Sequence, residues 1–218
     1  MVIAWAPGEL AYVHASLDKT GRYQIHRFGV ERQGSDSQED FFKRLSELGF
    51  KGRFAQIMLR LPQYQILQIE APAVAPEELR TAARYQIRDM VDVHIDDLTL
   101  DVMRLGDDKG RAVGHLFVVA AANALIREVM GIGLAMRCTV RIIDIQDLAQ
   151  RNLQTAWARR NSDMARAHAA LVVTDDSQAL LTISANEELF YSRRIELGAG
   201  FMRAGWGDGA VPARAVEA

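Results

Sequence analysis

Cysteine is nearly absent from the sequence and neither sign of charge is in excess, and each scarcity excludes a class of protein. Cys138 is the only cysteine among 218 residues, which excludes intramolecular disulfides and all-cysteine metal sites and fits a reducing compartment. Lysine and arginine number 26 against 28 acidic residues, for a formal net charge of −2. This balance offers no electrostatic basis for binding nucleic acid or an anionic membrane surface.

Long apolar runs are absent as well. The longest, residues 116–122, is far shorter than the ~20 residues needed to cross a bilayer. The first residues, MVIAWAPGELAY, have neither a basic start nor a sustained apolar stretch, so they do not form a secretory signal. Because 49% of the residues are hydrophobic, we expect a folded, cytoplasmic protein that reaches a membrane only through a partner.

The order of the expected elements predicts two related lobes. Three consecutive strands begin each half of the chain, whereas a Rossmann sheet places a helix after every strand. We expect helices at about 37–48, 76–90, 123–134 and 146–160. We expect strands at 2–6, 10–16, 23–30, 55–61, 66–69, 98–105, 113–122, 140–145, 169–173, 179–184 and 189–194.

Local signals mark the ends of the helices. Ser37 and Asp40 form a possible capping pair, and Gly49 stands where a left-handed residue would end the first helix. Pro76 opens the second helix at a position where its missing N–H costs nothing, and Asn123 is expected to cap the third.

Gly131 and Gly133 lack the third glycine of a dinucleotide-binding loop, so we interpret them as the end of the third helix.

Apolar residues at helical spacing predict which face of a helix is buried. The second helix is expected to turn inward Leu79, Ala83, Ile87 and Met90. The fourth is expected to turn inward Leu148, Ala149, Leu153 and Trp157.

Three segments, in this order along the chain, resemble segments of PilM-type pilus assembly proteins and most of all those of the MshI family. They are ELRTAARYQIRDMVDVHIDDLTLDVM, FVVAAANALIREVMGIGLAMRCTVRIIDIQDLAQRNL and LLTISANEELFYSRRIELGAG. The second contains the family-like run Asp144, Ile145, Leu148, Ala149, Arg151, Asn152 and Leu153. The resemblance extends over about residues 60–200.

The resemblance implies an α/β, actin-like (ribonuclease H-like) fold with an FtsA-like inserted subdomain. Residues 1–64 and 114–160 would form the first lobe, 65–113 the inserted subdomain, 161–205 the start of a reduced second lobe and 206–218 a flexible tail. The chain ends soon after Gly200, where family members usually continue with more helices.

The resemblance also implies a function. It is that of a non-catalytic scaffold of type IV (MSHA-type) pilus biogenesis, peripheral to the inner membrane. Such a protein binds the cytoplasmic tail of a PilN-like or MshJ-like membrane protein and connects it to the assembly ATPase. Two alternatives are an actin-like ATPase and the GspL-like cytoplasmic domain of a type II secretion system.

The two hairpins that hold phosphate in actin-like ATPases depart from the required pattern. That pattern is Asp-x-Gly followed by small hydroxyl residues, whose backbone N–H groups face the phosphates while the aspartate orders magnesium. The first hairpin reads Ala6, Pro7, Gly8: it has no aspartate, and Pro7 removes a donor. The second reads Thr174, Asp175, Asp176, in which Asp175 is a candidate for a displaced metal ligand. We therefore expect no cofactor, with ATP and magnesium as the alternative.

Catalytic and metal-binding constellations are not evident. The histidines are scattered and no Gly-x-Ser-x-Gly motif is present, so no nucleophilic triad can be argued. An acidic cluster and an arginine cluster are interpreted as solvated charge, with a metal site and an acidic or lipid partner as the respective alternatives. The clusters are Asp92, His94, Asp96, Asp97 and Asp101, and Arg151, Arg159, Arg160 and Arg166.

Partner binding requires apolar surface instead of a catalytic constellation. An apolar groove in the first lobe would suit the leucine- and proline-rich tail of a partner. The candidates for its lining are Phe54, Leu59, Leu61 and Tyr64, for which packing in the core is an equal explanation.

Overall fold

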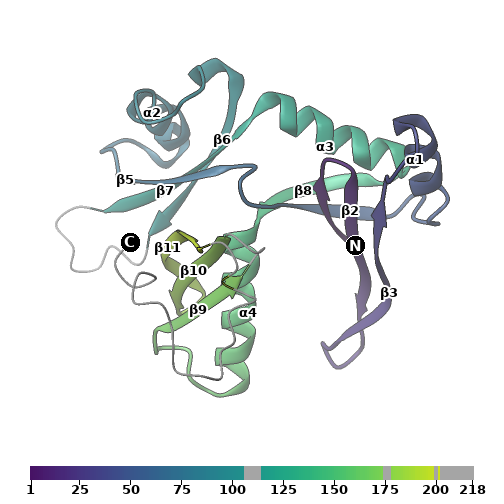
Figure 1. Cartoon of the computed structure of the whole chain (residues 1–218). Helices are drawn as coiled ribbons and strands as arrows, with labels where there is room; N and C mark the ends of the chain where they lie inside the picture. Colours follow the sequence, from purple (N-terminus) through teal and green to yellow (C-terminus); the bar gives the residue numbers. More distant parts are fainter. Residues whose placement is uncertain (106–113, 174–177, 199–200, 202–218) are drawn as a thin grey trace. The chain divides into compact units, whose positions relative to one another are not determined.

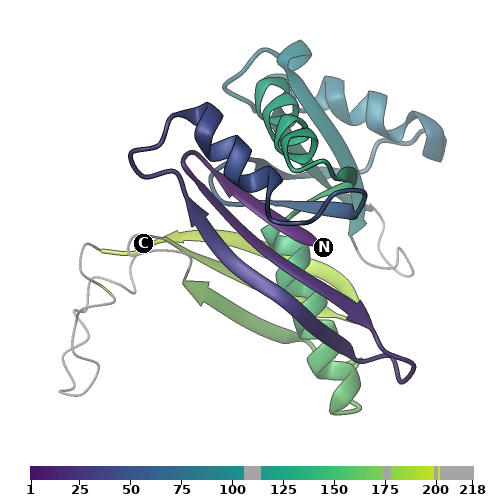
Figure 2. The same cartoon turned by 90° about the vertical axis from the view of Figure 1, so that its right-hand side faces the viewer.

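The computed structural model describes residues 1–105, 114–173, 178–198 and 201 (Figures 1 and 2). The chain forms two compact units, Met1–Gln146 and Asp147–Ala218. The described strands and helices follow one another in the predicted order, so the α/β class is confirmed. The boundary between the two units lies at the start of the fourth helix, whereas from the sequence we expected that helix at the end of the first lobe.

A mixed five-stranded sheet forms the centre of the first unit. Its order is β3-β2-β1-β4-β8, with β1 (Val2–Ala6), β2 (Glu9–Leu17) and β3 (Tyr23–Arg32) joined as an antiparallel meander. β4 (Phe54–Leu59) and β8 (Thr139–Ile145) continue the sheet parallel to β1. Such a sheet fits the α/β, actin-like fold that the resemblance implies.

Two helices, α1 (Gln38–Ser46) and α3 (Asn123–Ala135), meet at one tryptophan of this sheet. The Trp5 ring lies 6.1 Å from that of Phe41 in α1, and its Nε1 donates a 2.7 Å hydrogen bond to Glu128 in α3. Both helices therefore cover the same sheet face. The expected cap of α1 is confirmed, because Ser37 accepts a hydrogen bond from the Asp40 N–H.

A three-stranded antiparallel sheet forms the rest of the first unit, in the order β5-β7-β6. β5 (Gln65–Glu70) and β6 (Leu98–Leu105) flank β7 (His115–Ala122). The inserted subdomain was expected to end at 113; the strand that follows is instead its central strand. Its buried core combines the sheet with α2: Ile69, Leu79, Ala83, Ile87, Leu98, Leu100, Leu116, Val118 and Ala120.

The helix before β6 is shorter than predicted. It consists of the 3₁₀ turn η1 (Pro76–Glu78) and α2 (Leu79–Gln86), while a second 3₁₀ turn, η2 (Ile95–Asp97), precedes β6. Met90, expected on its inner face, is 49% exposed because the chain leaves the helix after Gln86.

Two expectations about α3 are wrong. Asn123 is its first residue and does not cap it: its side chain accepts from the Thr99 hydroxyl and donates to the Asp96 carbonyl. The glycines do not end α3, which continues to Ala135. A Cβ on Gly133 would overlap Cγ2 of Val140, whereas Gly131 faces open space. Gly133 therefore permits close packing of α3 against β8.

The second unit contains α4 (Gln146–Arg160) and a three-stranded antiparallel sheet, β11-β10-β9. Its strands are β9 (His168–Val173), β10 (Gln178–Ala185) and β11 (Glu188–Glu196). All four elements lie where the sequence predicted them.

The predicted inner face of α4 is wrong. Leu153 and Trp157 are 71% and 56% exposed, whereas the buried residues of α4 are Asp147, Gln150, Gln154 and Ala158. The helix contacts the sheet through side-chain amides. Gln150 donates to the carbonyl of Ala170 at 2.7 Å, and Gln154 donates to that of His168 at 2.7 Å. These bonds replace water for groups that would be costly to bury alone.

Candidate functional site

The turn between β1 and β2 holds the first expected phosphate hairpin, Ala6, Pro7 and Gly8. Gly8 has a φ of 75°, which favours glycine, and its carbonyl accepts a 2.8 Å hydrogen bond from the Gln33 N–H. Pro7 has no N–H to offer. The turn thus gives the phosphate of a nucleotide one donor fewer than an ordinary glycine-rich loop.

A carboxylate follows this turn directly. Glu9 accepts hydrogen bonds from Arg32 at 3.0 Å and from Arg60 at 3.2 Å. The bond from Arg32, helped by Arg60, lowers the pKa of Glu9 below its ordinary value although burial opposes this. The group is therefore ionised at neutral pH, and beside this turn it neutralises part of the positive charge of the two arginines that pair with it.

The second expected hairpin, Thr174, Asp175 and Asp176, lies outside the described residues. The strands on both sides of it, β9 and β10, form as predicted.

The four expected partner-binding residues do not share one surface. Leu59 and Tyr64 are each only 2% exposed and belong to the core, while Leu61 is half-buried. Phe54 is 53% exposed, and the guanidinium carbon of Arg141 lies 3.2 Å from its ring centroid. Core packing, the alternative explanation in the sequence, accounts for Leu59 and Tyr64.

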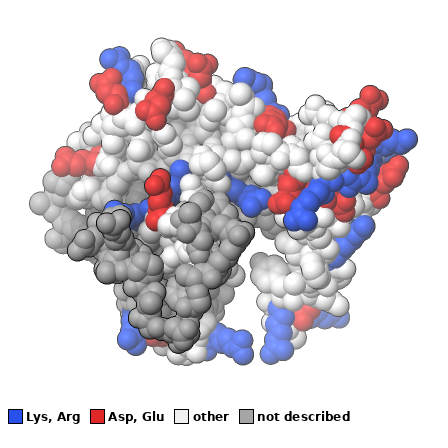
Figure 3. All heavy atoms as spheres, in the orientation of Figure 1, with Lys and Arg blue, Asp and Glu red and all other residues white. Residues whose placement is uncertain are grey.

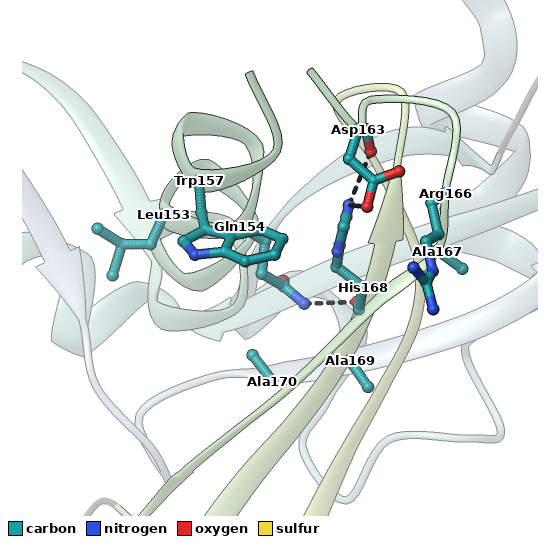
Figure 4. Close-up of a pocket in the computed structure, with 9 residues that line it drawn as sticks. All are labelled: Leu153, Gln154, Trp157, Asp163, Arg166, Ala167, His168, Ala169 and Ala170. Carbon is teal, nitrogen blue, oxygen red and sulfur yellow. Dashed lines mark hydrogen bonds and ion pairs between the residues drawn. The ribbon is translucent and has the colours of Figure 1, made fainter. Parts of the chain in front are cut away.

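The second unit has a depression with exposed apolar side chains at its edge. The depression has a volume of about 530 Å³ and lies between α4 and the segment leading into β9 (Figure 4). Leu153 and Trp157 approach it from α4, and Arg166 lies on the opposite side. The full lining is Leu153, Gln154, Trp157, Asp163, Arg166, Ala167, His168, Ala169 and Ala170.

The aromatic centre of this depression is held in place by hydrogen bonds. The rings of Trp157 and His168 meet edge to face, with centroids 5.1 Å apart at 73°. His168 Nε2 lies 2.9 Å from the Asp163 carbonyl; since a carbonyl only accepts, the ring donates from Nε2. The Asp163 carboxylate is 3.9 Å from the same nitrogen. Trp157 is thus packed on one side and exposed on the other.

Arg166 supplies an available positive charge at the rim. Among the described residues no acceptor lies within hydrogen-bonding distance of its guanidinium, whereas Arg159 is paired with Glu187 at 2.5 Å. An exposed tryptophan on one side of the depression and a guanidinium on the other suit a segment that carries an apolar side chain and a carboxylate. The sequence reasoning missed this site because it turned Leu153 and Trp157 inward.

Side chains of the acidic cluster pair with arginines or accept from a backbone N–H. Asp96 pairs with Arg84 at 3.1 Å and Asp101 with Arg80 at 2.9 Å. His94 Nδ1 accepts from the Asp96 N–H. No three potential metal ligands converge anywhere in the described ranges.

Ion pairs also join α1 to the end of β3. Arg44 contacts Glu31 at 2.7 Å and Asp36 at 2.8 Å. Basic and acidic side chains are accordingly interspersed over these two elements, at the right of Figure 3.

None of the helices in the described part of the chain is both long and apolar enough to span a bilayer.

Comparison with known proteins identifies the architecture. No protein-family model and no curated protein matches the sequence. A solved protein from Bacteroides thetaiotaomicron with an actin-like ATPase fold and unknown function matches at TM-score 0.53 and 8% identity, over 93% of this chain and 71% of that one. The fold is actin-like.

Two further structures share the actin-like arrangement. A chain of the PilM–PilN type IV pilus biogenesis complex matches at TM-score 0.70 and 14% identity, over 90% of this chain. This chain spans 61% of the length of that one. The cytoplasmic domain of EpsL, an inner-membrane component of the Vibrio cholerae type II secretion system, matches at TM-score 0.61 and 12% identity, over 89% and 70% of the two chains.

Proposed function

We propose that this chain is a non-catalytic cytoplasmic scaffold of type IV pilus biogenesis. It binds the cytoplasmic tail of a PilN-like inner-membrane protein and connects that protein to the assembly ATPase. The observation that supports this most directly is the likeness of 90% of the chain, at TM-score 0.70, to a chain of the PilM–PilN complex. Within this proposal, the sequence resemblance favours the MSHA-type pilus and an MshJ-like partner.

The first hairpin supports a role without nucleotide chemistry. Pro7 removes a donor, and the ionised Glu9 is paired with the guanidinium groups of Arg32 and Arg60, which are therefore less available to a phosphate. A scaffold needs neither a phosphate-binding turn nor a magnesium ligand, so the loss of both would leave its function intact.

The depression between α4 and β9 is the docking place that we propose for the tail. Leu153 and Trp157 expose apolar surface that a leucine or an aromatic residue of the tail would cover. Arg166, on the opposite rim, would pair with an aspartate or glutamate close to that residue. The expected tail is therefore a short extended segment in which an apolar residue stands beside an acidic one.

A type II secretion platform is the second candidate. The likeness to the cytoplasmic domain of EpsL supports it, since that structure is matched over 89% of this chain. In both candidates a cytoplasmic body belongs to a machine of the inner membrane, and the candidates differ in the machine.

Binding of the tail is the direct test. The full chain is titrated calorimetrically with a peptide that covers the cytoplasmic residues of a PilN-like protein from the same organism. We expect saturable binding that Trp157→Ala weakens by about 2 kcal/mol, as for a buried tryptophan in an interface. Arg166→Glu should weaken it too, because it replaces attraction with repulsion.

Matched controls separate the function from the location of the site. Leu134→Ala removes a residue that is 79% exposed on α3, and Arg22→Glu reverses an exposed charge in the β2–β3 turn; neither should affect binding. If no PilN-like tail binds the wild-type chain, the scaffold proposal is wrong. If the tail binds Trp157→Ala as tightly as wild type, the function stands and the docking place is wrong.

A further inference from the structure

The outer edge of the five-stranded sheet is a long strand with apolar residues exposed. β3 is the end strand of that sheet and contains 10 residues, none of them proline (Figure 2). An edge strand of this kind presents backbone donors and acceptors to any strand that can lie beside it. Its exposed apolar residues are Tyr23, Ile25, Phe28 and Val30, at 77%, 60%, 75% and 52%.

A β-bulge places these apolar residues on one face of the sheet. Phe28 lies opposite Val13, and the register shifts between His14 and Ala15 so that Ile25 lies opposite Ala15. Without the shift, alternation along the strand would put Ile25 and Phe28 on opposite faces. The edge therefore combines unpaired backbone with a continuous apolar stripe.

The middle of β3 is complementary to itself. The segment reads Arg27, Phe28, Gly29, Val30, Glu31. When two such strands run antiparallel around a two-fold axis at Gly29, Arg27 of each copy lies opposite Glu31 of the other. Phe28 then lies opposite Val30 on the apolar face. Opposite charges and apolar pairs at facing positions both stabilise a sheet.

The charged side chains of this segment are already held near the edge. Arg44 contacts Glu31, and one nitrogen of Arg27 donates to the Leu48 carbonyl at 2.6 Å. Within the described part of the chain the other guanidinium N–H groups of Arg27 have no acceptor, so they can donate to a facing carboxylate. Since both side chains are partly ordered before association, less rotamer freedom is lost when the strands pair.

The centre of the segment is a glycine that the ring of a neighbouring tyrosine covers. Gly29 has no side chain there, and the Tyr12 hydroxyl lies 2.9 Å from where its Cβ would stand. The phenol of Tyr12 thus covers Gly29 on the α1 side of the sheet, close to the edge. A two-fold pairing would bring the two phenols together above the axis.

We propose that β3 pairs antiparallel with β3 of a second copy of this chain, which joins the two five-stranded sheets into one. The charge complementarity of Arg27 and Glu31 about Gly29 points to a second copy as the occupant, because a two-fold partner presents the same pattern in reverse. This goes beyond the proposed function: it would give the scaffold two tail-binding units per particle.

Charge reversal tests the pairing in the full chain. Sedimentation equilibrium is measured for wild type, Arg27→Glu, Glu31→Arg and the double variant carrying both changes. We expect a wild-type dimer, and each single variant should weaken association by about tenfold or more, because two facing pairs become repulsive. The double variant should recover dimerisation, since a glutamate at position 27 would then face an arginine at position 31.

Mixing the two single variants gives the sharpest result. In a mixed pair, position 27 of Arg27→Glu faces position 31 of Glu31→Arg as opposite charges, and the second contact keeps Arg27 opposite Glu31. Each single variant should therefore be monomeric alone and dimeric in the mixture. No contact within one chain predicts this recovery, because neither variant regains its own lost bond to Leu48 or Arg44.

Three outcomes overturn the proposal. They are a wild-type chain that stays monomeric at its highest soluble concentration, a dimer that the single variants leave unchanged, and single variants that fail to associate when mixed. Lys43→Glu on α1, a reversal of charge away from the edge, is the control and should dimerise like wild type.

Discussion

Replacing each of two glycines in α3 with alanine should have opposite effects on stability. Gly131 and Gly133 lie in the same helix two residues apart, so alanine improves helix propensity at both positions by about 0.5–1 kcal/mol. A Cβ at 131 meets nothing, whereas a Cβ at 133 overlaps Cγ2 of Val140. Gly131→Ala should therefore raise the free energy of unfolding.

The difference between the two variants isolates the cost of the close packing. Inserting a methyl group into a filled site costs about 1–3 kcal/mol, and β-branched valine has little rotamer freedom with which to yield. Gly133→Ala should thus be less stable than Gly131→Ala by about that amount. Urea denaturation followed by circular dichroism measures both variants against wild type.

A second substitution checks the cause. Val140→Ala removes the methyl group that Gly133→Ala would displace, so the double variant should recover part of the loss, and the two changes should not be additive. Equal stabilisation by both single alanine variants would refute the reasoning, since it would mean that α3 and β8 do not approach closely at Gly133.

Three more predictions concern single groups. Arg32 lowers the pKa of Glu9 in the folded chain, so the ion pair should stabilise the fold at pH values above the ordinary glutamate pKa. This stabilisation should be lost as the pH falls through the lowered pKa. When the free energy of unfolding is measured from about pH 7 to pH 3, Glu9→Gln should therefore lose less stability than wild type. Gln154→Leu should lower the free energy of unfolding in urea by about 1–3 kcal/mol, because it leaves the buried Thr182 hydroxyl without its acceptor. Its control, Asn152→Ala on the exposed side of α4, should change that free energy by less than about 0.5 kcal/mol. Millimolar Mg-ATP should leave the melting temperature unchanged; a clear rise would favour the actin-like ATPase.

Local sequence signals were sufficient to predict where the strands and helices lie. Short β-rich runs separated by turn residues gave the meander of β1 to β3, and the same pattern returned in β9 to β11. Pairing between distant strands was harder to predict. The apolar sequence of β7 predicts a buried strand, but it does not indicate which strands are its neighbours. In the structure β7 lies between β5 and β6.

The orientation of α4 was the most consequential error, and it has a physical reason. Apolar periodicity assumes that a helix buries its apolar side, but the side-chain NH2 groups of Gln150 and Gln154 find carbonyl acceptors on the sheet. The helix can then expose Leu153 and Trp157. Only the register of helix against sheet reveals this, and the sequence does not contain that information locally.

The two proposals together predict a difference between soluble and surface-bound tails. A chain that pairs through β3 would hold two depressions, so two tails fixed on one surface would be bound by a single particle. The second tail then binds at the high local concentration set by the linkage, which strengthens overall binding without any new contact.

A charge reversal at the strand edge can measure this gain. Arg27→Glu lies in the first unit and leaves every residue that lines the depression unchanged, so its affinity for the free peptide should equal that of wild type. On beads coated with the same peptide, Arg27→Glu should dissociate faster than wild type, and its mixture with Glu31→Arg should restore slow dissociation. Equal dissociation of all three from the beads would mean that dimers, if they form, do not engage two tails at once.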